Sequence, residues 1–357
     1  MGSPDLTEAD SDISAFVDTQ DAIFNLLDNY EPSANDDSIK ILAAMWKYLP
    51  TDGRANFAED VLECSSDEEI KQLADSIVSG LLNPMQAMIE RAVLPSPSQL
   101  ESMLDEPVTR SIQGVLRDQC LCRDGNMCAV SHFYNMALLD QSRPAHHTRP
   151  HPYLQAAHIL PSPHGMFSTN DERWQTARVW DNIYRYFPTL RTHLNFDNTS
   201  LNSSVDNMMM LTEQLHRDFG RFNFALEASN VPNQYRVKKF PRLDATSNLV
   251  MSSSGIVTFT CHDRRYPPPS PVLLSVHAAI ANILNATGRA EAVEKILQDY
   301  NTTKMLARDG STDVSRLLSV SALSLLSDEK KNAPQKQEDL RPGRDENTVL
   351  LLDGVYQ

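Results

Sequence analysis

Apolar residues recur at helical spacing through the first third of the chain. Ile23 and Leu27 belong to one such pattern, and Ile41 and Met45 belong to the next. Asp37 and Ser38 are candidate caps for the second pattern, which stops before Pro50. The spacing predicts four helices in this part of the chain, over residues 13–30, 38–49, 54–64 and 67–82.

The remainder of the chain mixes short apolar runs with longer periodic segments. Strands are predicted over residues 154–160, 222–228, 233–240 and 256–262. Helices are predicted over residues 172–187 and 272–299, the latter broken at Gly288, while 207–217 is predicted as a helix or a buried turn. The mixture predicts an α+β fold.

Charge is distributed unevenly around the net value of −15. Residues 1–117 hold 22 acidic and 7 basic side chains, whereas residues 118–310 hold 17 and 19, together with all ten histidines. This change indicates a boundary near residue 118. The predicted organisation is a disordered start (1–12), an acidic helical region (13–117), a central domain with C-terminal helices (118–310) and a disordered tail (311–357).

Several broad classes are disfavoured by composition. The chain has no run of 18 apolar residues, so no membrane span is expected. Its first residues are acidic and lack the apolar core of a secretory signal, and five cysteines do not suit a disulfide framework. We therefore expect an intracellular protein, cytoplasmic or nuclear, with reduced thiols.

Three residues in order suggest a catalytic motif. His158 lies at the end of a predicted strand, Asn207 follows much later, and His216 comes nine residues after Asn207. This is the order of an HNH-type ββα-metal site. In that chemistry His158 would be the general base that activates water, Asn207 would orient it, and His216 would help to hold a divalent metal.

The segments around these residues resemble fungal HNH-domain proteins. The resemblance rests on RDGNMCAVS at 123–131, AAHILP at 156–161, NMMMLTEQLHRDFGRFNFAL at 207–226 and PPPSPVLLSVHAAIANILNATGRAE at 267–291. It extends over about residues 115–295. It implies a central ββα-metal module within the α+β fold, preceded by the acidic helical region.

Some positions depart from the pattern of active HNH nucleases. Ala157 stands where the resemblance implies a metal ligand before the first histidine, and Gly220 stands where related proteins often have Asp, with Asp218 two positions early. The opening motif ends in Ser131–His132 instead of Thr-Gly. Because a divalent ion needs several ligands at once, the metal-ligand positions are degenerate.

Three functions from different classes follow. The first is an HNH-derived enzyme of fungal secondary metabolism, a use that the resemblance implies for terpenoid tailoring. It would be a metal-free cyclase or pericyclase, closing a ring by Diels–Alder chemistry in an apolar pocket at the old HNH site, with a small apolar substrate and no cofactor. His158, His216 or Arg221 would donate a hydrogen bond to the substrate.

The second function is a metal-dependent endonuclease that acts on DNA, with His158 as base and Mg²⁺, Mn²⁺, Ni²⁺ or Zn²⁺ held in part by His216. The third is a non-catalytic protein that binds a protein partner through its acidic helical region. The sequence favours the first, because the central segment carries only a small positive charge and a duplex requires several basic contacts.

Other candidate sites have simpler interpretations. Cys120, Cys122, Cys128 and His132 are a possible zinc set, although the Cys-x-Cys spacing is tighter than zinc sites generally use. Met208, Met209 and Met210 are predicted as core, as are the aromatic residues between 174 and 187. Two basic clusters, Arg236–Lys238–Lys239–Arg242 and Arg264–Arg265, are candidates for phosphate binding.

Overall fold

The fold is described from a computed structural model, which covers residues 19–33, 36–86, 107–136, 150–151, 153–160, 170–193 and 204–291. The segments predicted to be disordered, 1–12 and 311–357, lie outside these residues. None of the helices in the described stretches is long and apolar enough to cross a membrane.

The predicted N-terminal helices are present. They are a helix over 19–28, α2 (Ser38–Tyr48), α3 (Thr51–Leu62), and α4 (Asp67–Ile77), which continues as the π-helix η1 (Val78–Leu82). The start of α4 shows why the sequence folds here, because the Ser66 hydroxyl accepts from the Glu69 amide while Glu69 accepts from the Ser65 amide. This pattern resembles a capping box, except that Glu69 accepts from the residue before the N-cap.

The start of α2 differs from the prediction. Ser38 is already inside the helix, and Asp37 occupies the N-cap position without a side-chain bond to the first turn. Asp36 accepts the Ser38 amide instead, at 2.8 Å. The side chain of Asp37 is taken by Arg289, whose guanidinium donates to both carboxylate oxygens at 2.6 and 2.7 Å.

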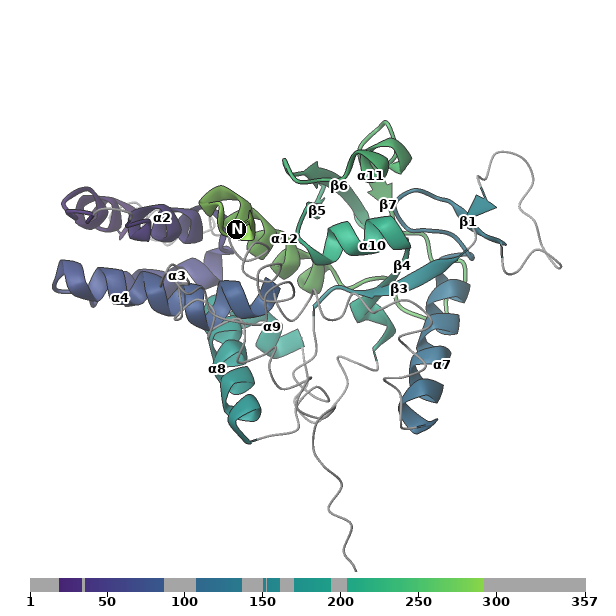
Figure 1. Cartoon of the computed structure of the whole chain (residues 1–357), viewed down its shortest axis with the longest axis horizontal. Coiled ribbons are helices and arrows are strands. Elements are labelled where there is room, and N and C mark those ends of the chain that lie inside the picture. The colour runs from purple at the N-terminus through teal and green to yellow at the C-terminus, as the bar shows by residue number, and fades with distance from the viewer. Residues whose placement is uncertain are drawn as a thin grey trace, which may run out of the picture.

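A two-stranded sheet followed by a helix forms the centre of the molecule. Strands β3 (Leu154–His158) and β4 (Met208–Thr212) are antiparallel, and α10 (Glu213–Gly220) begins directly after β4 (Figure 1). The prediction of a helix or turn over 207–217 was therefore wrong for residues 208–212. All five are buried, so the strand is an apolar run without alternation, and such a run resembles a buried helix in sequence.

The other strands lie where they were predicted, with shorter bounds. β5 (Phe224–Ala228), β6 (Gln234–Lys239) and β7 (Ile256–Thr258) form an antiparallel sheet in that order, with α11 (Ala245–Val250) between β6 and β7 in the chain. A short parallel pair, β1 (Tyr134–Asn135) and β2 (Pro150–His151), completes the strands of the described residues.

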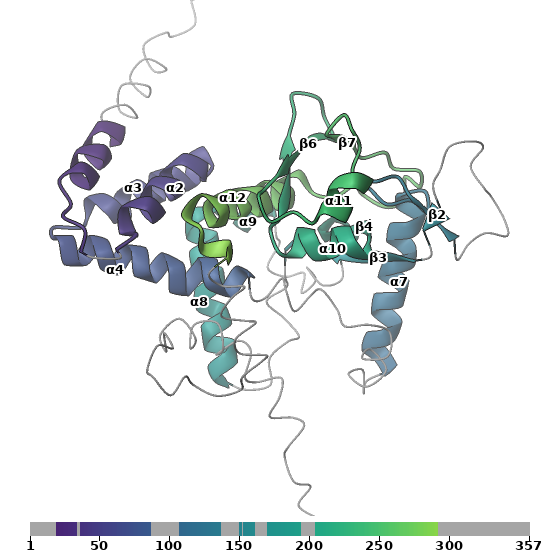
Figure 2. The ribbon, with the colours of Figure 1, turned by 45° about the horizontal axis from the view of Figure 1, so that its top comes forward.

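Helix α12 (Pro271–Thr287) connects the two halves of the molecule. It starts with the Ser270 hydroxyl as cap and Pro271 in the first turn, and it ends at Gly288, whose φ of 74° is left-handed. α12 packs against α2 on one side and β5 on the other (Figures 1 and 2). One continuous hydrophobic cluster therefore includes both the N-terminal helices and the central strands.

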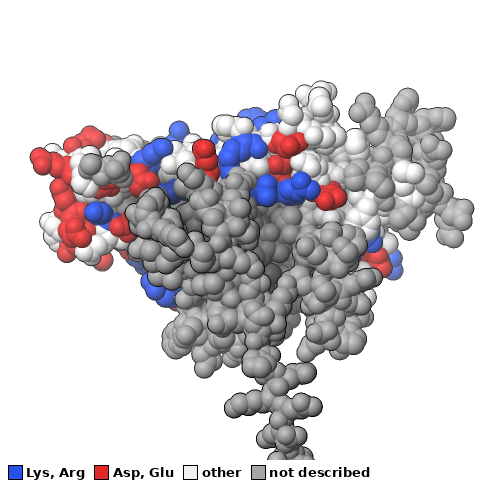
Figure 3. All heavy atoms as spheres, in the orientation of Figure 1, with Lys and Arg blue, Asp and Glu red and all other residues white. Residues whose placement is uncertain are grey.

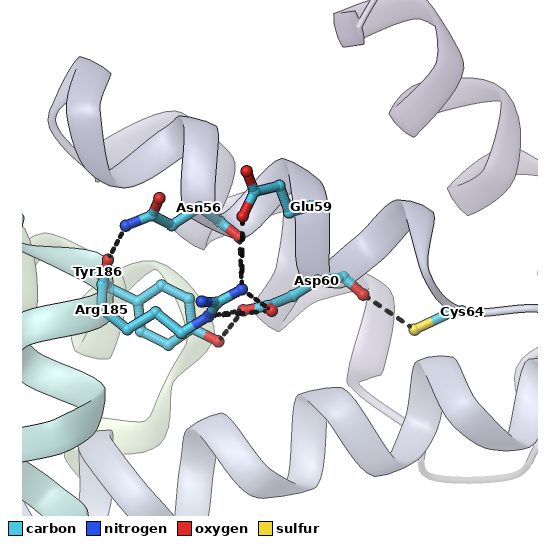
Figure 4. A network of polar contacts seen from close by, with 6 residues as sticks. All are labelled: Asn56, Glu59, Asp60, Cys64, Arg185 and Tyr186. Carbon is cyan, nitrogen blue, oxygen red and sulfur yellow. Dashed lines mark hydrogen bonds and ion pairs between the residues drawn. The ribbon is translucent and has the colours of Figure 1, made fainter.

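The N-terminal helices also contact α8 (Asn170–Tyr186) and α9 (Pro188–His193). Arg185 forms a bidentate pair with Asp60, the Tyr186 hydroxyl donates to the same carboxylate at 2.9 Å, and Asn56 donates to the Arg185 carbonyl oxygen at 2.6 Å (Figure 4). Gly53 permits this approach, since a Cβ there would lie 2.0 Å from the Tyr186 carbonyl oxygen. The charge boundary at residue 118 lies within α7 (Pro107–Arg123).

Candidate functional site

The β3–β4–α10 unit brings the three motif residues together. His158 is the last residue of β3 and lies opposite Met208, the first residue of β4. Asn207 immediately precedes β4, and His216 lies on α10, which packs on both strands. The local fold follows from the sequence: buried apolar residues pair the strands, and the Thr212 hydroxyl caps α10 by accepting from the Leu215 amide at 3.4 Å.

Asn207 is a fully buried amide that holds the chain directly after His158. Its Nδ2 donates to the Leu160 carbonyl oxygen at 2.8 Å, and its Oδ1 accepts from the Leu160 amide at 2.9 Å. The Ile159 amide donates to the Asn207 carbonyl oxygen at 2.8 Å. Asn207 therefore fixes the exit of β3, and with it the backbone that carries His158.

The two motif histidines are neutral at physiological pH. Burial lowers the pKa of His158 to about 4, and burial together with nearby His158 lowers the pKa of His216 to about 4. His216 Nδ1 bonds to Gln155 Oε1 at 2.7 Å, whereas His158 Nε2 is buried without a hydrogen-bond partner among the described residues. An unpaired buried nitrogen costs about 1–3 kcal/mol, so its presence at a motif position requires an explanation.

The donor set for a metal contains imidazole but no carboxylate. Ala157 is buried and offers no ligand atom. Asp218 accepts from Asn223 Nδ2 at 2.8 Å and from the Ser247 hydroxyl, so its carboxylate links α10 to α11. Among the described residues, no three His, Cys, Asp or Glu side chains come together in a way that would hold a metal ion.

The cysteine set does not assemble as a zinc site. Cys120, Cys122, Cys128 and His132 all belong to the described stretches, and they do not form such a cluster. Cys120 is buried, and burial raises the pKa of its thiol to about 12. Cys122 is exposed. The cysteines do not come together because residues two positions apart on a helix, as in Cys-x-Cys at the end of α7, point to different sides.

Arg221 lies at the C-cap of α10, five residues beyond His216. Five helical residues correspond to a rotation of roughly 140°, so the two side chains leave different sides of the helix. The Arg221 carbonyl oxygen accepts from Arg242 at 3.2 Å. On the face drawn in Figure 3, acidic side chains gather on the end of the molecule formed by α2–α4, and basic ones lie nearer to α12, β5 and β6.

The basic side chains of the predicted clusters have separate partners or lie on opposite faces in the structure. Lys238 pairs with Glu227 at 3.1 Å, and Lys239 donates to Asn248 Oδ1 at 2.8 Å. Arg236 is exposed on the same strand. Because side chains alternate along β6, Lys239 lies on the face opposite Arg236 and Lys238. Arg265 is held by Asp263 in an exposed bidentate pair.

An Arg–Asp pair within the RDGNMCAVS segment has a role that sequence analysis missed. Arg123 is fully buried and donates to both Asp124 oxygens at 2.7 and 3.0 Å. It also donates to the carbonyl oxygens of Val205 and Met208, and Asp124 accepts from the Met210 amide at 2.9 Å. The pair therefore locks α7 onto the start of β4. The sequence does not show that this arginine is buried. Its one signal there is its position in the RDGNMCAVS segment.

Two cavities lined by described residues lie away from the motif histidines. One of about 260 Å³ lies between α2, β5, β6 and α12, with Tyr48, Tyr235 and Asn282 in its wall. A second of about 220 Å³ lies beside it, between α9 and α12. Met208, Met209 and Met210 are buried core residues, as predicted. Trp180, Tyr186 and Phe187 are also buried in the core, while the Trp174 side chain lies outside the description.

These observations agree with a comparison of the chain with protein families. Residues 128–227 match the HNH endonuclease family model HNH_2. This segment of the chain is therefore similar to HNH endonuclease domains. The matched segment begins just after the Arg123–Asp124 pair and contains β3, β4, α10 and most of β5, so all three motif residues belong to it. No curated protein and no solved structure matches the chain significantly.

Proposed function

We propose that this protein is an HNH-type phosphodiester hydrolase acting on nucleic acid. The observation that carries the proposal is the pair of neutral imidazoles, His158 and His216, on the β3–β4–α10 unit, with the backbone of the first fixed by Asn207. The match of residues 128–227 to the HNH endonuclease family supports it.

His158 would act as the general base. Its pKa of about 4 leaves the ring unprotonated at neutral pH, so the ring is able to accept a proton from an attacking water. Its Nε2 is buried and has no hydrogen-bond partner among the described residues, so a water or substrate would have to reach it for this role. Asn207 would keep that nitrogen in place through the two bonds to Leu160.

His216 would hold a divalent ion, and the donors present fit some ions better than others. Imidazole nitrogen suits Zn²⁺ or Ni²⁺, whereas Mg²⁺ prefers oxygen ligands and near-octahedral geometry. With His158 acting as the base, His216 is the one motif imidazole left for the ion among the described residues, and Ala157 offers no carboxylate. A borderline ion therefore suits this donor better than Mg²⁺ does, and water or substrate oxygens would have to supply the remaining ligands. Such an ion, when bound, would neutralise charge that develops on the phosphate.

Substrate contacts would come from basic side chains of α10. Arg217 follows His216 directly in the chain and pairs with Glu213 at 3.2 Å, whereas Arg221, at the C-cap, leaves the helix on a different side from His216. Phosphates are contacted mainly by Lys and Arg, and such contacts weaken as salt rises. The acidic N-terminal helices pack on α8, α9 and α12, away from this helix.

The test is a plasmid-nicking assay with Zn²⁺, Ni²⁺, Mn²⁺ and Mg²⁺ in turn. We expect cleavage with Zn²⁺ or Ni²⁺, and we expect His158→Ala to lower the rate by about 10²–10⁴-fold, the usual contribution of a general base. His262→Ala is the matched control, because His262 is exposed and outside the motif. A folded protein that cleaves with none of the ions would overturn the proposal.

The ring-closing enzyme of terpenoid metabolism stays a prediction from the sequence. It needs an apolar pocket at the histidines, and the two cavities above are lined instead by residues of α2, α9, α12 and the β5–β6 strands. Those two cavities therefore lend the ring-closing function no support. A protein partner for the acidic helices, and a cytoplasmic or nuclear location, likewise stay predictions.

A further inference from the structure

Gln155 is a residue of β3 whose side chain reaches across to α10. It lies opposite Leu211 in the β3–β4 register, and its Oε1 is 2.7 Å from Nδ1 of His216. Both ends of this contact are fixed, since β3 and β4 form a paired sheet and α10 follows β4 without a loop. The contact is therefore built into the ββα unit.

We infer that Gln155 is a positioning residue that selects the tautomer of His216. An amide oxygen only accepts hydrogen bonds, so Nδ1 of His216 carries the proton and Nε2 keeps a free lone pair. The role assigned to that lone pair, binding an ion or a substrate group, rests on the proposed function. The tautomer itself does not.

The arrangement matches a general requirement of histidine ligands. A histidine that binds through one ring nitrogen usually donates its other N–H to an oxygen, which fixes the ring and raises its basicity. Here the oxygen is provided by a neutral amide on the strand that also carries His158. Because Gln155 and His158 share β3, the same strand positions both imidazoles of the site.

The opposite arrangement has a distinct signature. If the amide were reversed, the NH₂ group of Gln155 would donate to Nδ1 and the proton of His216 would lie on Nε2. That nitrogen would then be a donor, unable to bind an ion. The two arrangements place the proton on different ring nitrogens, and nitrogen chemical shifts distinguish a protonated ring nitrogen from an unprotonated one.

The experiment is long-range ¹H–¹⁵N correlation NMR on the full chain, labelled at histidine and free of metal, at pH 7. Loss of one set of signals in His216→Gln identifies the ring. We expect a protonated Nδ1 in the wild type, loss of this preference in Gln155→Met, and its retention in Gln155→Glu, which keeps an acceptor oxygen. A wild-type ring protonated on Nε2, or an unchanged tautomer in Gln155→Met, would overturn the inference.

A titration with Zn²⁺ alone separates this inference from the proposed function. We expect Gln155→Met to bind Zn²⁺ about 10–100-fold more weakly than wild type, and Gln155→Glu to bind it about as well. If the tautomer follows Gln155 but no variant binds Zn²⁺ or cleaves, the positioning role stands and the hydrolase proposal fails. If wild type and Gln155→Met cleave at equal rates and the tautomer is unchanged, the hydrolase proposal stands and the positioning role of Gln155 is rejected.

Discussion

The α3–α8 interface and the histidine site differ in whether their polar groups are hydrogen-bonded. At the interface, Asp60 accepts from both Arg185 and Tyr186, and the network of Figure 4 joins two helices from distant parts of the chain. At the site, Nε2 of His158 is buried and has no hydrogen-bond partner in the part of the chain that the structure describes. The first arrangement stabilises the fold, and the second leaves capacity for another molecule.

His277 shows that burial and a missing partner are not enough to define a site. This residue of α12 is fully buried, and burial lowers its pKa to about 3. Its ring stacks on Phe219 at 3.8 Å and on Phe222 at 4.7 Å, and Nε2 donates to the Phe219 carbonyl oxygen at 3.2 Å. Enclosed between two rings, His277 is part of the core. His158 differs because it is partly exposed and lies near a second imidazole.

The largest effect expected of a single substitution concerns a buried polar pair that stabilises the fold. Arg123→Met leaves the Asp124 carboxylate and three carbonyl oxygens without their donor in the interior. Removing one partner of a buried ion pair costs about 3–5 kcal/mol. Urea denaturation measures the change in the free energy of unfolding.

The matched control is Arg265→Met, which removes the same kind of bidentate pair at the surface. Because water replaces the lost contacts there, we expect no measurable change. An equal loss of stability in the two variants would contradict the view that the Arg123–Asp124 pair locks α7 onto β4.

The next effect concerns pH. His158, His216 and His277 all have a lower pKa folded than unfolded, where it is about 6.5, so the unfolded chain binds more protons as the pH falls. The free energy of unfolding therefore has its full value above pH 6.5 and decreases as the pH falls toward 4. Each histidine contributes a slope of at most about 1.4 kcal/mol per pH unit. Urea denaturation at a series of pH values between 7 and 4 gives this slope.

A variant assigns the slope to individual rings. His277→Gln keeps a donor for the Phe219 carbonyl oxygen and has no charge to lose, so the slope should decrease by about one histidine's share. His262→Gln alters an exposed ring and should leave the slope unchanged. If the slope is the same in His277→Gln as in wild type, the assignment of His277 to the neutral core is wrong.

The smallest effect concerns the α3–α8 interface. The Arg185 side chain is 41% exposed, so its pair with Asp60 is screened by water. We expect Arg185→Gln to lower the free energy of unfolding by about 0.2–1 kcal/mol. A double-mutant cycle with Asp60→Asn, followed by urea denaturation, isolates the pair, and a coupling of several kcal/mol would show that the network is effectively buried.

Local patterns in the sequence predicted the helices and most strands because their signals lie within a few residues. The spacing of Ile41 and Met45 in α2 and the stop at Gly288 after α12 are examples. The cap of α2 was predicted only in part, because Asp37 is the N-cap residue but its side chain pairs with the distant Arg289. The strand β4 was mispredicted because Met208–Thr212 depends on its pairing with β3.

In the candidate site too, the order of the residues was predictable and their contacts were not. The order His158, Asn207, His216 is readable in sequence, and the structure places the three on one ββα unit. What each side chain contacts is not readable. Neither the two bonds from Asn207 to Leu160 nor the contact of Gln155 with His216 has a local signal, because they join residues 47 and 61 positions apart.

The position of α12 has a consequence for synthesis. This helix packs against α2, yet more than 200 residues separate the two in the chain. At about 5–20 residues per second, α2 leaves the ribosome on the order of ten to forty seconds before its partner. During that interval the side of α2 that packs on α12 is uncovered, so the nascent N-terminal helices expose apolar surface to which chaperones bind.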